Sequence, residues 1–232
     1  TPEFPLPPVG STHKDKAYRV AIRRLGRLEG KFSRTGPRGK KLDYWRGQCG
    51  AIDGVVFRTF APTKSVKDPK RYKVTRKGCF GLLVVAIADA DRRIIWWSMA
   101  ASSTSHDSLA WRMTELGQRI TAGNLPFPYF ISGDSAFKPG GNSMAVPGAD
   151  DLYNYVQSSN RMPIECSFGM LVRSYGILWR PLQCQFERRA PLLSCLFKLY
   201  NTRIENRVPF LDKYPTKMKR VRCRGKTVLR EM

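Results

Sequence analysis

The chain has 232 residues, of which 42% are hydrophobic, so it can bury a core of its own. Lys and Arg number 41 against 18 Asp and Glu, which gives a formal net charge of +23. This excess argues against a neutral enzyme indifferent to polyanions and favours nucleic acid as the partner, ahead of an anionic membrane. Because no apolar run approaches about 18 residues, we expect no membrane-spanning helix.

The apolar pattern predicts an alternation of strands and helices. We expect, in chain order, a ragged basic helix over 16–31, a short strand over 51–57 and a hairpin of strands 80–88 and 93–99. A helix from 105 to 123 and a strand over 128–134 follow. The last elements are a helical region over 150–173, which Pro163 kinks or divides, and an amphipathic helix over 192–204. Mixed strands followed by helices predict an α/β sheet layered with helices.

The cations are segregated along the chain. Residues 14–46 hold twelve Lys and Arg against three acids, residues 64–77 hold seven against one, and residues 198–230 hold eleven against two. The centre, residues 79–165, holds six cations against eight acids. Each block could be a solvated surface. Three blocks around an acidic centre fit better with a polyanion lying over an acidic catalytic site.

The six cysteines (Cys49, Cys79, Cys166, Cys184, Cys195 and Cys223) show neither paired spacing nor a Cys/His ligand pattern. We therefore expect reduced, mostly buried thiols of an intracellular protein and no zinc site.

Three acids occupy positions that are unusual for surface acids. Asp53 lies inside an apolar strand, on the face of Ala51 and Val55; Asp134 follows the end of an apolar strand, and Glu165 begins an otherwise apolar helix turn. Each could be a capping or turn residue. Together, carboxylates without His or Cys favour Mg²⁺ or Mn²⁺ over zinc.

Six stretches, read in order, carry a resemblance to a known family. Residues 47–54 resemble "GxxGxIDG", residues 72–78 resemble the segment before the second strand, residues 86–89 resemble "xxCD" with Ala in place of Cys, residues 103–108 resemble "GSxHDS", residues 133–137 resemble "GDSGY", and residues 153–172 resemble "FNxxxxxxRxxVExxFGxLK". The region from 45 to 182 thus resembles the DDE superfamily endonucleases of harbinger-type DNA transposases. Ala136 replaces the usual Gly of that pattern and Val172 its Lys.

The resemblance implies an RNase H-like fold, a mixed five-stranded sheet with helices on both faces. It also implies that Asp53, Asp134 and Glu165 are the catalytic residues and hold two Mg²⁺ (or Mn²⁺) ions, with Asp53 bridging both. Such a centre cleaves DNA phosphodiesters and then joins strands, with the freed 3′-OH as nucleophile.

The pair His106 and Asp107 has two readings. Asp107 or Ser105 caps the helix that follows, or His106 and Asp107 support the active site. For Trp96 and Trp97, packing in the core or on the sheet is favoured over a surface stacking platform for bases.

We predict three segments: a basic N-terminal extension (1–45), the endonuclease domain (46–200) and a basic C-terminal tail (201–232). The predicted DNA-binding residues are cations of the second and third blocks: Lys70, Arg71, Lys73, Arg76, Lys77, Lys217, Lys219, Arg220, Arg222, Arg224 and Lys226. The run 217–226 has almost no apolar periodicity, so we expect it to be mobile without a partner and to serve in phosphate binding and nuclear import.

The partner expected is double-stranded DNA, in the nucleus and without a membrane. Because no helix-turn-helix is evident before Asp53, recognition of a DNA site could rest on a separate DNA-binding protein; a homo-oligomer is left open.

Two alternatives to the endonuclease function remain. One is a domesticated DDE-derived protein that binds DNA without cutting it, and the other is a basic ribonucleoprotein component whose acids are coincidental.

Overall fold

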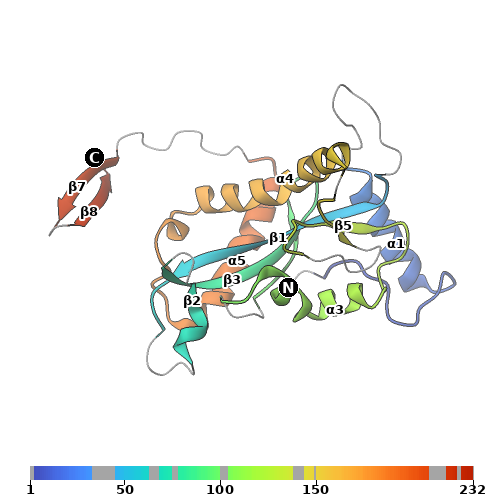
Figure 1. Cartoon of the computed structure of the whole chain (residues 1–232), viewed down its shortest axis with the longest axis horizontal. Helices are drawn as coiled ribbons and strands as arrows, with labels where there is room; N and C mark the ends of the chain where they lie inside the picture. Colours follow the sequence, from blue (N-terminus) through green and yellow to red (C-terminus); the bar gives the residue numbers. More distant parts are fainter. Residues whose placement is uncertain are drawn as a thin grey trace.

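The computed structural model describes residues 3–32, 45–62, 68–74, 78–99, 104–137, 144–148, 150–208, 218–223 and 226–231 (Figure 1). The helices are α1 (Lys16–Glu29), η2 (Pro69–Tyr72), α2 (Asp107–Arg112), α3 (Glu115–Thr121), α4 (Asp151–Ser174), η5 (Gly176–Trp179) and α5 (Phe186–Glu205). The strands are β1 (Gln48–Thr59), β2 (Lys73–Val74), β3 (Cys79–Ala88), β4 (Ile94–Ser98), β5 (Phe130–Ser132), β6 (Met144–Ala145), β7 (Met218–Cys223) and β8 (Lys226–Glu231).

A mixed sheet of six strands forms the centre of the fold. Strand β3 pairs antiparallel with β1 on one edge, while β2 and β4 share its other edge, β2 beside the first residues of β3 and β4 beside the last. Strands β5 and β6 follow β1 in parallel orientation. The expected sheet had five strands. The structure has six, and two of them, the two-residue strands β2 and β6, are not among the strands that the apolar pattern predicts.

Successive side chains of a strand point to opposite faces of the sheet, and each face has its own hydrophobic core. Ile52 and Trp96 lie in the cluster that also holds buried residues of α1, α2 and α3. Ala51, Phe57 and Trp97 lie in the cluster that holds buried residues of α4 and α5. Helices therefore cover both faces of the sheet, and Figure 1 shows α4 above it and α3 below. Both tryptophans are buried, as the favoured packing interpretation predicted.

The N-terminal segment packs on the sheet. Helix α1, predicted at this position, is amphipathic, and its Leu25 is fully buried in the same cluster as Ile52. Phe4, which precedes the helix, is buried in the same cluster. The described part of the predicted basic extension, residues 3–32, therefore shares the hydrophobic core with the sheet.

Two helical regions differ in detail from the expected ones. The single helix expected over 105–123 is divided into α2 and α3, because the Thr114 hydroxyl accepts a hydrogen bond from the Gly117 N–H (2.9 Å) and so begins a second helix. Pro163 does not divide α4, which runs uninterrupted to Ser174. Asp150 caps α4 by accepting from the N–H of Leu152 at 2.8 Å.

The C-terminal basic run has secondary structure that the sequence analysis does not predict. Strands β7 and β8 pair antiparallel as a separate two-stranded sheet. The register places Val221 opposite Val228, and such β-branched pairs favour strands even in a run dominated by cations. Before this hairpin, α5 continues to Glu205, past the predicted boundary at residue 200.

Among the cysteines whose side chains are described, all are free: Cys49, Cys79, Cys166, Cys184 and Cys195. The reduced state agrees with the prediction for these five. Only Cys49 of this group is buried, so the expectation of mostly buried thiols is wrong for the described residues. None of the described helices combines the length and apolar character that crossing a membrane requires.

Candidate active site

Asp53 stands in the middle of β1, opposite Ala86 of β3, and is half-buried. Its Oδ1 accepts a hydrogen bond from the N–H of Gly54 at 2.9 Å. Burial raises the pKa of Asp53 to about 6, against the lowering effects of this hydrogen bond and of the Arg161 charge. The charges of Asp134 and Asp107 raise this pKa further, so both acids are close enough to act on Asp53 electrostatically.

Asp134 reaches this region through the parallel pairing of β1 with β5. Ser132, the last residue of β5, pairs with Ala51, so the chain leaves β5 beside the part of β1 that carries Asp53. The Asp134 carboxylate accepts a hydrogen bond from the N–H of Ala136 at 2.9 Å, which shapes the turn. The preceding Gly133 is held from two sides, since its N–H donates to Ala145 (2.8 Å) and its carbonyl accepts from the Gln157 amide of α4.

Glu165 lies on α4 and is turned toward its own helix. Its Oε1 forms an ion pair with Arg161 at 2.7 Å, one helical turn earlier. In the part of the chain that the structure describes, no three His, Cys, Asp or Glu side chains are grouped closely enough to hold a metal ion. The structure thus places Asp134 where its charge acts on Asp53, and it pairs Glu165 with Arg161.

His106 and Asp107 stand where α2 begins. His106 is the N-cap residue but makes no side-chain capping bond, and Asp107 lies in the first turn. The Asp107 carboxyl group is packed over Gly54, since a Cβ at position 54 would lie 2.5 Å from the Asp107 Cγ. The residue after Asp53 therefore has to be small, and Asp107 joins the surroundings of Asp53. His106 is exposed.

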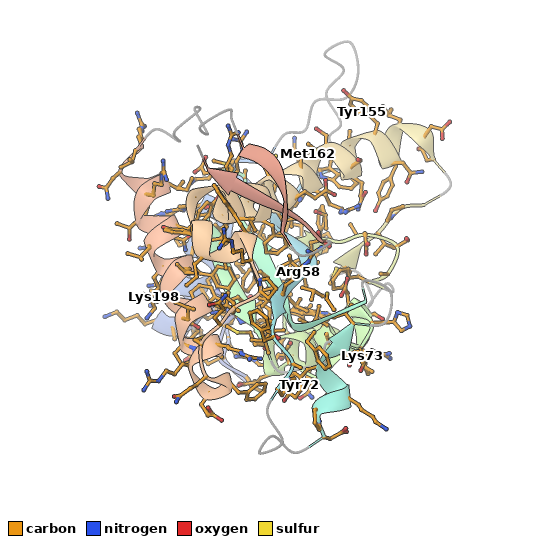
Figure 2. The ribbon with its side chains drawn as sticks, turned by 90° about the vertical axis from the view of Figure 1, so that its left-hand side faces the viewer. Arg58, Tyr72, Lys73, Tyr155, Met162 and Lys198 are labelled. Atoms are coloured by element: carbon orange, nitrogen blue, oxygen red, sulfur yellow. The ribbon has the colours of Figure 1, made fainter. Side chains whose placement is uncertain are left out.

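Part of the predicted DNA-binding set lies at one end of the sheet. Lys70 and Arg71 belong to η2, and Lys73 of β2 is opposite Phe80 of β3. Arg58, which the sequence analysis did not select, is exposed and opposite the neighbouring Gly81. Figure 2 shows Arg58 near the middle of the view, with Tyr72 and Lys73 below it and Tyr155 and Met162 on α4 above.

The rest of the predicted DNA-binding set falls elsewhere. Lys219, Arg220 and Arg222 belong to β7 and Lys226 begins β8. Arg76, Lys77, Lys217 and Arg224 lie outside the described residues.

Two residues with a clear place in this site were not selected from the sequence. Arg161 was read only as part of a motif, although its spacing of four from Glu165 is that of a helical ion pair. Gln48 is buried at the start of β1, where its side chain accepts from Trp45 Nε1 (2.7 Å) and donates to Ser132 Oγ (2.7 Å). It ties β1 to β5, and no sequence motif signals that role.

The donor chemistry of the site fits a hard divalent cation. Asp53 and Asp134 supply carboxylate oxygens, which Mg²⁺ and Mn²⁺ prefer. The two acids repel each other, and a bound cation would relieve this repulsion. Glu165 has the right chemistry but is held by Arg161.

A family model described as "DDE superfamily endonuclease" matches residues 52–201, a span that contains all three predicted catalytic acids. Neither a curated protein nor a solved structure matches the chain.

Proposed function

Because the chain belongs to the DDE superfamily endonuclease family, we propose that it is a metal-dependent DNA endonuclease of the transposase type, which cleaves DNA phosphodiesters and joins the ends. The observation that supports this most is the place of Asp134 just after β5, the strand that pairs with β1, where its charge acts on Asp53. The sheet, covered by helices on both faces, fits the RNase H-like fold of this superfamily.

In the proposed reaction, the oxygen of a water molecule forms a bond to phosphorus and the bond from phosphorus to the 3′ oxygen breaks. The products are a 5′ phosphate and a free 3′-OH. In the joining step the oxygen of this 3′-OH forms a bond to the phosphorus of a second phosphodiester, the bond from that phosphorus to its own 3′ oxygen breaks, and the departing 3′ oxygen takes up the proton as a new 3′-OH. Two Mg²⁺ or Mn²⁺ ions, when bound, would stabilise charge on the attacking and leaving oxygens and lower the pKa of the water. Asp53 and Asp134 would hold these ions, and Glu165 would join them as a third carboxylate.

The environment of Asp53 suits this role at neutral pH. Its pKa of about 6 leaves the carboxylate mostly ionised at pH 7, so it can bind a cation without first losing a proton. The Gly54 N–H fixes one carboxylate oxygen. Asp107, packed over Gly54, adds negative charge to the same region, and we propose that it supports the site by attracting cations.

The basic surface would hold the DNA. We propose that Lys70, Lys73 and Arg58 at one end of the sheet contact phosphates, together with the predicted cations of the C-terminal run. We also propose that the protein belongs to the harbinger-type subclass, acts in the nucleus and recognises its DNA site through a separate DNA-binding protein. The proposed segment boundaries are residues 45 and 200.

Supercoiled plasmid DNA tests the activity directly. With Mg²⁺ or Mn²⁺, the wild-type protein should nick the plasmid. Asp53→Asn, which keeps the size of the side chain and removes its charge, should lower the nicking rate by at least about a hundredfold. Glu187→Gln removes an exposed acid from the first turn of α5 and should leave the rate unchanged.

The outcome also separates the alternatives. Protein that binds the plasmid tightly but does not nick it with either metal would favour the domesticated DNA-binding protein. Nicking that persists in Asp53→Asn would point to a contaminating nuclease and overturn the proposed active site.

A further inference from the structure

The ion pair between Arg161 and Glu165 is unlike an ordinary surface pair. The two residues are one helical turn apart on α4, and the Arg161 side chain is only 16% exposed, against 45% for Glu165. The guanidinium group therefore points into the protein, whereas helical pairs of this spacing commonly lie in solvent.

The surroundings of Arg161 leave one of its donors unused. Its terminal NH2 donates to Glu165, but its Nε is buried and has no hydrogen-bond partner among the described residues. A buried donor without a partner is unfavourable, so this arrangement persists for some other reason. An attraction to nearby negative charge supplies one.

Asp53 is a second acid, besides Glu165, within range of the Arg161 charge. Among the charged groups that act on Asp53, Arg161 has a larger effect than either Asp134 or Asp107. Among the described residues, Arg161 is therefore the cation that acts on Asp53, and the same guanidinium holds Glu165.

We propose that Arg161 is the built-in counter-ion of the acid centre and a positioning residue that keeps Glu165 apart from Asp53 and Asp134 until a divalent cation displaces it. This inference rests on the proposed function, because it assumes that a divalent cation binds at these acids. A cation that enters competes with Arg161 for both Asp53 and Glu165. The resting protein therefore binds the cation weakly, and the third carboxylate joins only when the guanidinium withdraws.

The test measures Mn²⁺ binding to the full-length protein by calorimetry, without DNA. Arg161→Gln removes the counter-ion and should raise Mn²⁺ affinity about tenfold. Arg188→Gln removes an exposed cation from α5 and should leave the affinity unchanged. If Arg161→Gln and the wild type bind Mn²⁺ equally, Arg161 does not act as the counter-ion.

A double-mutant cycle separates the release of Glu165 from a general loss of positive charge. In a Glu165→Gln background, Arg161→Gln should give a clearly smaller gain, because the charge near Asp53 is still removed but no carboxylate remains to be released. A tenfold gain in that background as well would show that Arg161 acts by charge alone and overturn the positioning role. If Arg161→Gln fails to fold, Arg161→Lys, which keeps the charge but loses the planar fork, should give a smaller gain that also requires Glu165.

The two proposals fail in different ways. If Mn²⁺ binding is absent, or is unchanged by Asp53→Asn, the proposed metal-dependent function fails. If Mn²⁺ binds through Asp53 but the cycle shows no dependence on Glu165, only the role of Arg161 fails.

Discussion

At the scale of single residues, the candidate site combines burial with like charge. Asp53 is removed from much of the solvent and faces the fields of Asp134 and Asp107, and these effects outweigh the Gly54 hydrogen bond and the charge of Arg161. Such an arrangement is unfavourable for folding and suits the binding of a cation. The pKa of Asp53 therefore links stability to function.

We predict that Asp53→Asn stabilises the metal-free protein at neutral pH. The folded pKa of about 6 lies above the ordinary 3.8, so the folded state holds more protons than the unfolded state between these values. Stability accordingly falls as the pH rises through this window, by up to about 3 kcal/mol. Above pH 6 the asparagine variant should be more stable by that order, and the difference should shrink to near zero below about pH 4.

Urea unfolding of both proteins at pH 7.5 and pH 3.5, in the presence of a chelator, checks this prediction. Asp151→Asn, at an exposed acid in the first turn of α4, serves as the control. A variant that is less stable than the wild type at neutral pH would show that the Asp53 carboxylate is well accommodated in the fold.

At the scale of elements, α1 belongs with the sheet. It lies before residue 52, where the family match begins, yet Leu25 is buried against the core of β1. Leu25→Ala should lower the free energy of unfolding by about 2–5 kcal/mol, since it leaves a cavity in a packed cluster.

The matched control on the same helix is Val20→Ala. Val20 is 39% exposed, so its truncation should change the free energy of unfolding by less than about 1 kcal/mol. Equal, small effects of the two substitutions on urea unfolding would mean that α1 is only loosely attached to the domain.

The sequence predicts elements well where apolar residues recur with a clear period. The run before Ala88 is of this kind, and β3 forms where expected. The pattern over 16–31 is more ragged, yet α1 also forms where expected. The division at Thr114 depends on one capping bond to Gly117, which is too local a signal to outweigh the apolar stripe. The hairpin β7–β8 depends on how its two strands pair, and the many cations of this run obscure the apolar alternation that would predict a strand.

The same reasoning explains what could be predicted of the site. The candidate acids are visible because each interrupts an apolar setting. The ion pair of Glu165 with Arg161 follows from their spacing of four on α4. The effect of Arg161 on Asp53, by contrast, depends on how α4 lies over β1, a tertiary arrangement that no spacing in the sequence encodes. The effect of Asp107 on Asp53 likewise requires two elements to meet at Gly54.

At the scale of the whole molecule, the dominant property is the net charge of +23. We predict DNA binding that is strong, weakly sequence-selective and steeply dependent on salt, because the neutralisation of each phosphate releases counterions. Deletion of residues 214–232 removes seven Lys and Arg. The truncated protein should keep its fold, bind DNA more weakly and show a shallower salt dependence, the slope falling by roughly 0.9 for each phosphate that the shorter chain no longer neutralises.

Fluorescence anisotropy with a labelled duplex at several salt concentrations measures this slope. A full-length variant in which the same seven cations are replaced by Gln separates the effect of charge from that of length. The role of the C-terminal run is refuted if the truncated protein binds DNA as tightly as the full chain.

The parallel pairing of β1 with β5 has a consequence for biosynthesis. Asp53 and Asp134 meet only after β2, β3, β4, α2 and α3 have been made, and Glu165 follows later still on α4. Closing so long a loop is slow, and the pairing it allows forms late in folding. During translation the nascent chain therefore exposes its basic N-terminal residues well before it can assemble the acids, and a prematurely terminated chain that ends before α4 lacks the third acid altogether.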